Sequence, residues 1–171
     1  DEDRSWDIQE HCQALLAARG YAQYEVSAYA QPGRQCQHNL NYWKYGDYLG
    51  IGAGAHGKLT LGAGQGILRR WKTRHPTVYQ GEAGTAASLG GDERIAPERR
   101  AFEFMLNALR LNEGFRLCDF EARTGLARAS IQGELEQALA RGWLQVEGEQ
   151  VSPTALGRRF TNDVVGLFLE R

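Results

Sequence analysis

Apolar residues recur along the chain with two different periods. Residues 5–21 carry them at helical spacing and include Gly20 as a stop signal, which predicts a helix. Residues 21–30 alternate apolar and polar positions, which predicts one strand, and a Pro-Gly pair follows it. Residues 56–64 predict another strand that ends in a glycine turn. A helix followed by a strand is typical of a βα unit, so the first part of the chain predicts an α/β architecture.

The second part of the chain predicts a compact, mostly helical unit. Its first helix carries Phe102 and Met105 on one face and ends at Gly114. The expected elements are helices over 97–114, 117–126 and 128–142, a hairpin over 143–154 and a closing helix over 155–170. Three helices, a two-stranded wing and a further helix are the pattern of a winged-helix domain.

Residues 80–97 separate the two parts. They are rich in Gly, Ala and Ser and lack apolar periodicity, which predicts a surface loop or linker. All seven tyrosines lie before residue 80 and all six phenylalanines lie after residue 101, so the composition also changes across this segment. We therefore expect two domains, residues 1–95 and residues 96–171.

The charge balance argues against a nucleic-acid partner. Lys and Arg number 20 and Asp and Glu number 21, whereas a surface that binds phosphates needs clustered cations. From Glu98 onward there are ten basic and eleven acidic side chains, and the predicted third helix of this part carries Glu134 and Glu136. A transcription-factor-like winged helix joined to a ligand-sensing half is therefore the least favoured interpretation.

Cysteine usage and hydropathy predict a cytoplasmic protein. Cys12, Cys36 and Cys118 are odd in number and far apart, which argues against a disulfide framework. No apolar run approaches the roughly 20 residues of a membrane span, and the first residues do not have the pattern of an export leader. Nothing in the sequence indicates contact with a membrane.

Residues 50–55 read GIGAGA and formally satisfy the dinucleotide fingerprint G-x-G-x-x-A. That motif needs a helix directly after the glycines, because the helix N-terminus holds the pyrophosphate. Here a strand with Leu59 and Leu61 follows, so we expect no dinucleotide site. The glycines instead indicate backbone that closely approaches a neighbouring strand or a flat ligand.

The segment HNLNYW, residues 38–43, places a histidine between polar and aromatic neighbours. It follows a Pro-Gly turn, so we expect His38 on a loop. Imidazole is a ligand for haem iron, and aromatic side chains pack well against a porphyrin. A zinc site would instead combine Cys36 and His38 with His56 or Cys12. A hydrogen-bonding histidine, a haem ligand and a zinc ligand are all compatible with these residues.

The stretch YEVSAYAQPGRQCQHNLNYWKYGDYLGIGAGAHGK closely resembles the oxygen-independent coproporphyrinogen III oxidase-like branch of the radical S-adenosylmethionine (SAM) proteins. More narrowly it is similar to the HemW-type haem chaperones, and H-N-x-x-Y-W is the most specific shared motif. The resemblance continues to the closing FTNDVVGLFLE and covers essentially the whole chain. The residues it assigns are His38, Asn39, Tyr42 and Trp43 for haem, with His38 on the iron, and Ala55 and His56 near SAM in full-length relatives.

One part of that family's chemistry is missing from the sequence. The family holds a [4Fe-4S] cluster with a C-x-x-x-C-x-x-C loop and binds SAM with an early glycine-rich motif, and neither occurs here. The resemblance therefore implies a C-terminal portion of mixed α+β class: the end of a partial, TIM-like α/β barrel followed by a winged-helix-like domain. Such a chain should not run the radical step alone.

The resemblance implies haem binding and transfer to a haem-accepting protein, with the cluster and SAM bound in the full-length protein. The alternative function is an oxygen-independent coproporphyrinogen III oxidase, which decarboxylates coproporphyrinogen III oxidatively to protoporphyrinogen IX.

From Tyr48 to Gly81 the chain contains no Asp or Glu. Five cations without a nearby acid occur there: Lys58, Arg69, Arg70, Lys72 and Arg74. Arginine binds carboxylates through two parallel hydrogen bonds, so Arg69 and Lys72 are candidate contacts for the propionates of a porphyrin. Alternatively, this basic segment docks on another part of the protein or on a partner.

Overall fold

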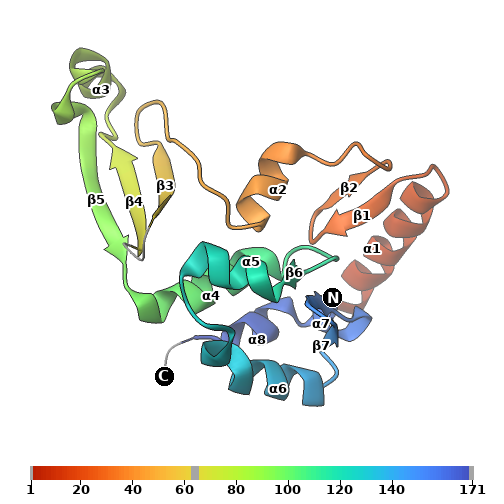
Figure 1. Cartoon of the computed structure of the whole chain (residues 1–171). Helices are drawn as coiled ribbons and strands as arrows, with labels where there is room; N and C mark the ends of the chain where they lie inside the picture. The colour runs from red at the N-terminus through yellow and green to blue at the C-terminus, as the bar shows by residue number, and fades with distance from the viewer. Residues whose placement is uncertain (1, 63–65, 170–171) are drawn as a thin grey trace.

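The computed structural model describes residues 2–62 and 66–169. A three-stranded sheet stands at one side of a helical base, the first helix and a small hairpin stand at the other, and α2 lies between them (Figure 1). In chain order the elements are α1 Glu2–Ala17, β1 Ala22–Glu25, β2 Ala28–Ala30, α2 Gln37–Trp43, β3 His56–Leu61, β4 Gly66–Lys72, α3 Pro76–Glu82, β5 Leu89–Ile95, α4 Pro97–Ala108, β6 Phe115–Arg116, α5 Leu117–Thr124, α6 Gln132–Ala140, β7 Leu144–Glu147, β8 Gln150–Pro153, α7 Ala155–Arg159 and α8 Thr161–Gly166. Short 3₁₀ turns, Ala86–Ser88 and Arg128–Ile131, precede β5 and α6. The fold is thus mixed α+β, as expected.

The strand predicted over residues 21–30 is in fact a hairpin. β1 and β2 pair antiparallel, with Ala22 opposite Ala30. The chain turns after Glu25, whose side chain is buried and forms an ion pair with Arg110 at 3.4 Å. Arg110 follows the C-terminal end of α4 and is 85 residues from Glu25 along the chain. The alternation of apolar and polar residues over 21–30 cannot reveal this ion pair, which holds the turn in place. Every strand pair among the described residues is antiparallel, so the parallel pairing of the βα unit expected in the first part does not occur within them.

The linker predicted over residues 80–97 is wrong. α3 ends within it, and β5 forms the outer strand of the antiparallel sheet β3-β4-β5. Only Ile95 of β5 is fully buried, so the strand shows no apolar alternation. Gly91 lies opposite Trp71 of β4, and a Cβ at Gly91 would approach the indole ring to 2.5 Å. The glycines that suggested a loop therefore make room for a tryptophan.

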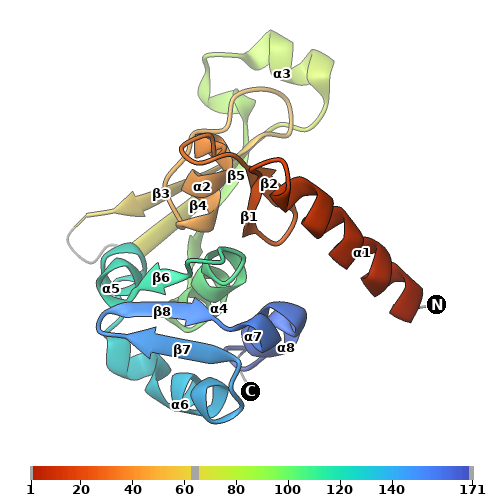
Figure 2. The same ribbon diagram turned by 90° about the vertical axis from the view of Figure 1, so that its right-hand side faces the viewer.

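The predicted helices of the second part are confirmed in outline. They surround the antiparallel sheet β6-β8-β7, which lies between α5 and α6 (Figure 2). The closing helix predicted over 155–170 is divided into α7 and α8 at Phe160, and residue 170 lies outside the described residues. The hydroxyl of Thr161 donates to the carbonyl of Arg158 at 3.0 Å, a back-bond of the kind that bends helices.

The main core joins the sheet to the second part. Phe104 and Phe120 lie at its centre in edge-to-face contact, with ring centroids 5.3 Å apart. Tyr45, Ile67 and Ile95 belong to the same core although they precede the expected boundary near residue 95. That boundary stays a prediction, and the core shows that residues on both sides of it are packed together.

Candidate functional site

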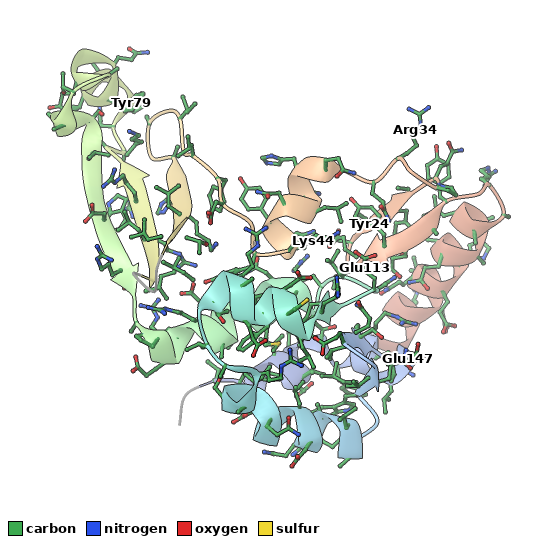
Figure 3. The ribbon with its side chains drawn as sticks, viewed as in Figure 1. Tyr24, Arg34, Lys44, Tyr79, Glu113 and Glu147 are labelled. Carbon is green, nitrogen blue, oxygen red and sulfur yellow. The ribbon has the colours of Figure 1, made fainter. Side chains whose placement is uncertain are left out.

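His38 lies in the first turn of α2 and not in the predicted loop. Cys36 has an extended backbone (φ −69°, ψ 106°), and its carbonyl accepts the amide hydrogen of Leu40 at 3.0 Å, which starts the helix. Leu40 is buried against Tyr24, so tertiary packing stabilises a helix of only seven residues. The Tyr24 hydroxyl accepts a hydrogen bond from the Cys36 amide at 3.4 Å (Figure 3).

Three aromatic side chains form a row that begins at His38. Its imidazole meets the ring of Tyr42 edge to face at 4.8 Å, since residues four apart share one face of a helix. Tyr42 in turn meets Tyr48, beyond the helix, at 4.6 Å and 65°. The imidazole end of the row is exposed, and the two tyrosines are half-buried. We call His38, Tyr42 and Tyr48 the aromatic row.

Trp43 points away from this row. Its ring packs against the cluster that contains Leu40, and the Arg110 guanidinium lies 4.3 Å from its centroid. Among the described residues its indole nitrogen is buried without a hydrogen-bond partner. Asn39 is half-buried on the same short helix. The structure therefore divides the H-N-x-x-Y-W motif between the exposed His38 with the half-buried Tyr42 and the packing face with Trp43.

An ion pair links the end of α2 to the base of the molecule. The Lys44 ammonium, directly after the helix, lies 3.3 Å from the Glu113 carboxylate (Figure 3). Both side chains are more than half exposed, so the pair contributes little free energy.

A buried lysine anchors the segment after α2 to the sheet. The Lys58 ammonium donates to the Tyr45 carbonyl at 2.9 Å and to Asp47 at 3.1 Å, and it lies over the Tyr45 ring. Burial lowers the pKa of Lys58, and the hydrogen bond that it donates to Asp47 opposes this shift. Asp47 also accepts the amide hydrogen of Thr60 at 2.9 Å. Lys58 is thus a buried cation that holds the segment after α2 on the sheet, a role that its position in the basic segment does not reveal.

Glu103 of α4 is the centre of a second polar network beneath the sheet. Its carboxylate accepts hydrogen bonds from the Tyr45 hydroxyl at 3.0 Å and from Arg69 at 2.8 Å, and Arg99 lies 3.4 Å away. Burial raises the pKa of Tyr45, and the nearby charge of Glu103 raises it further. The sequence offered one signal that was missed: Glu103 lies between Phe102 and Phe104, within the apolar stretch of a helix.

The expectation of cations without nearby acids is wrong for three of the five. Lys58 pairs with Asp47, Arg69 with Glu103, and Arg70 with Asp92 at 3.1 Å. The acids come from outside residues 48–81, because the antiparallel sheet and α4 bring distant segments together. A window along the sequence cannot detect such pairs.

The two candidate propionate contacts lie on opposite faces of the sheet. Arg69 faces α4 and Glu103, whereas Lys72 lines a small pocket of about 140 Å³ together with Arg70 and Leu59. Residues three apart in a strand point to opposite sides. Both cations lie near Tyr48 of the aromatic row, because Arg69 acts on it electrostatically and Lys72 lines the same pocket, but they belong to opposite faces of the sheet.

The glycine-rich segment leads into β3 at Ala55 and His56. Both backbone groups of Ala55 are used within the chain, its amide with Gly52 at 3.2 Å and its carbonyl with Lys72 at 2.9 Å. The amide of Gly52 also donates to the hydroxyl of Tyr79 on α3 at 3.2 Å (Figure 3). His56 is exposed and stacks on Trp71 at 6.1 Å and 28°.

The described residues do not assemble a metal cluster of their own. Across residues 2–62 and 66–169, no three His, Cys, Asp or Glu side chains lie together as metal ligands. The zinc alternative with Cys36, His38 and His56 or Cys12 is thus not formed there. The cysteines, which lie in α1, before α2 and in α5, are free and do not fit a [4Fe-4S] cluster. Within the same ranges no helix is long and apolar enough to cross a bilayer.

One family model and several named proteins match the sequence of this chain. The model of the HemN C-terminal domain family matches residues 95–160. The chain is 46% identical over 169 residues to the heme chaperone HemW of Escherichia coli K12. This alignment covers 99% of this chain and 43% of the Escherichia coli protein. The chain is 42% identical over 170 residues to the heme chaperone HemW of Haemophilus influenzae, with coverage of 99% and 43%. The chain thus spans less than half the length of these relatives.

A solved structure shares the fold. Coproporphyrinogen III oxidase (HemN) from Escherichia coli, described as a radical SAM enzyme, superposes with a TM-score of 0.66 at 17% identity. The match covers 98% of this chain and 41% of that chain. The identity along nearly the whole sequence shows that the chain belongs to the HemW family, and residues 95–160 match the HemN C-terminal domain.

Proposed function

We propose that this chain is the haem-handling part of a HemW-type chaperone, which binds haem as cargo and passes it to an accepting protein. The observation that carries the proposal is the aromatic row, which ends in an exposed imidazole on the helix that bears H-N-x-x-Y-W. The identity of 46% to a protein named heme chaperone HemW supports the same conclusion.

The residues of the row fit a haem cargo. Within the described part of the chain neither ring nitrogen of His38 has a hydrogen-bond partner, so an iron can be reached without breaking a native contact. Tyr42 offers aromatic surface beside the porphyrin. Arg69 is 37% exposed at its side chain, and its remaining N–H groups can donate to a propionate. Trp43 and Asn39 shape the helix that presents His38.

The finer architecture forms part of this proposal. We assign residues 1–95 to the end of a partial α/β barrel region and residues 96–171 to a winged-helix-like domain, with the hairpin β7–β8 as its wing. The order of α4, α5, α6 and the hairpin β7–β8 supports the second assignment. The [4Fe-4S] cluster and SAM belong to the full-length protein, where SAM would lie near Ala55 and His56. We expect the whole protein to reside in the cytoplasm.

The proposed function favours haem transfer over oxidation of coproporphyrinogen. The chaperones match at 46% and 42% identity, whereas the HemN oxidase shares the fold at 17%. No residue of this chain is assigned a catalytic role.

A haem titration tests the proposal. Haem is added to the 171-residue chain, and the Soret band is followed for the native sequence, for His38→Ala and for the control His11→Ala. His11 is an exposed histidine on α1, far along the chain from the row. We expect at least a tenfold loss of affinity for His38→Ala only. Equal affinity in all three proteins would refute the proposed role of His38.

A further inference from the structure

Tyr48 ends the aromatic row but lies outside the H-N-x-x-Y-W motif. It is held differently from the other two members. His38 and Tyr42 lie on a helix of seven residues, whereas Tyr48 is bonded to the edge of the sheet. Its amide donates to the Lys58 carbonyl at 3.0 Å, and its carbonyl accepts from the Lys58 amide at 2.9 Å.

The residues next to Tyr48 in the chain and in β3 hold its backbone close to the sheet. Asp47, the preceding residue, is bonded to Thr60 and Lys58. A Cβ at Gly57 would lie 3.1 Å from the Tyr48 carbonyl, so only a glycine lets the two segments approach without displacement. Tyr48 is therefore a fixed point on the sheet, against which the ring of Tyr42 rests.

The Tyr48 hydroxyl is not used by the fold. It has no hydrogen-bond partner among the described residues, and its side chain is half-buried. Its electrostatic neighbours are Arg69, Tyr42 and Glu103, which places it between the helix and the polar network of the sheet. The ring, and not the hydroxyl, makes the contact that links α2 to the sheet.

We propose that Tyr48 is a positioning residue of the haem site: its ring fixes Tyr42 and, through Tyr42, the orientation of the His38 imidazole. This inference rests on the proposed function. Aromatic rings prefer edge-to-face geometry, and the contacts of Tyr42 with His38 and Tyr48 at 4.8 and 4.6 Å both have it. The contact needs an aromatic ring at position 48 and does not need the phenol.

The test combines haem titration with spectroscopy. Tyr48→Ala should weaken haem binding about three- to tenfold and change the spin-state bands of the bound ferric haem. Tyr48→Phe should restore the affinity and the spectrum of the native chain. Tyr21→Ala, at an exposed tyrosine between α1 and β1, is the matched control and should change neither. A merely structural role would not predict that the haem spectrum follows the presence of the ring.

A second pair of variants tests the positioning without removing the ring. Gly57→Ala requires the Tyr48 segment to shift by a few tenths of an ångström, so it should change the spectrum in the same direction as Tyr48→Ala but less. Gly62→Ala, just beyond β3, meets open space and should have no effect. Circular dichroism melts show whether each variant is folded.

The outcomes separate the two proposals. If His38→Ala weakens binding but Tyr48→Ala and Gly57→Ala leave affinity and spectrum unchanged, the role of Tyr48 is refuted and the proposed function stands. If Tyr48→Phe fails to restore the native spectrum, the phenol and not the ring is required, which also overturns the inference. If His38→Ala has no effect, the proposed function itself fails.

Discussion

The guanidinium of Arg69 in β4 lies 2.8 Å from the carboxylate of Glu103 in α4. Glu103 is 7% exposed at its side chain, and it also accepts the hydroxyl hydrogen of Tyr45. One carboxylate thus connects the sheet, the segment after α2 and the first helix of the second part. A buried charge is stable only when its hydrogen bonds are complete, so this connection fixes how the sheet stands on the base.

The first prediction follows from that connection. Glu103→Gln removes the charge and leaves Arg69 and Tyr45 with poorer partners, so we expect a loss of about 1–3 kcal/mol in the free energy of unfolding. Urea denaturation measures it. Glu147→Gln, at an exposed position on β7 (Figure 3), is the control and should change stability by less than about 0.5 kcal/mol. Equal stabilities of the two variants would show that Glu103 does not hold the sheet.

Asp47 predicts a pH dependence of stability. Partial burial alone would raise its pKa, but the hydrogen bonds from Thr60 and Lys58 lower it below the ordinary 3.8. The folded protein therefore binds the proton of this group less readily than the unfolded chain does. The stabilisation is complete above about pH 5 and is lost as the pH falls through the folded value.

Urea midpoints between pH 2 and pH 7 measure this dependence. Native protein should exceed Asp47→Asn in stability at neutral pH, and the difference should shrink on acidification. Asp163→Asn, at an exposed residue of α8, serves as the control. A difference between native protein and Asp47→Asn that is independent of pH would contradict the assignment.

Two glycines predict opposite effects of the same substitution. A Cβ on Gly157 in α7 would collide with the backbone carbonyl of Trp143, so Gly157→Ala should destabilise the protein by about 1–3 kcal/mol. Gly133 in α6 faces open space, and Gly133→Ala should stabilise by about 0.5–1 kcal/mol. Thermal melts of both variants decide this. A stable Gly157→Ala protein would mean that α7 can move away from Trp143.

The core predicts how the two parts behave when separated. Residues 97–171 supply 14 of the 17 members of the main core, so we expect them to fold alone with a cooperative thermal transition. Residues 1–96 made alone lose that core and expose unpaired strand edges, which recruit other chains. Size-exclusion chromatography and circular dichroism melts test both halves. A monomeric, cooperatively melting front half would place the domain boundary elsewhere.

Local signals predict most of the helices of the second part. Their apolar faces are regular, as at Phe102 and Met105, and α5 ends at Gly125, which adopts a positive φ. The helix predicted to end at Gly114 instead ends at Ala108, and the short strand β6 was not predicted. The family motif was equally local, because His38 and Tyr42 are one helical turn apart. These features need no knowledge of distant partners.

The missed features depend on contacts between distant segments. The sequence of β5 predicts a linker because it contains glycines, and the structure shows that these glycines leave space for the ring of Trp71 in β4. α2 looked like a loop because its stability comes from burying Leu40 against Tyr24 and not from its own sequence. Likewise, the partners of Lys58 and Arg69 lie outside the basic segment. A single sequence contains these residues but not their pairing.

Imidazole rescue of a His38→Gly variant tests the central claim most directly. The substitution removes the side chain proposed to reach the iron and leaves Tyr42 and Tyr48 in place. We predict that His38→Gly binds ferric haem weakly with an altered Soret band, and that added imidazole restores the native spectrum. His11→Gly should bind haem normally without imidazole. A native spectrum in His38→Gly before imidazole is added would contradict the assignment of His38 to the haem iron.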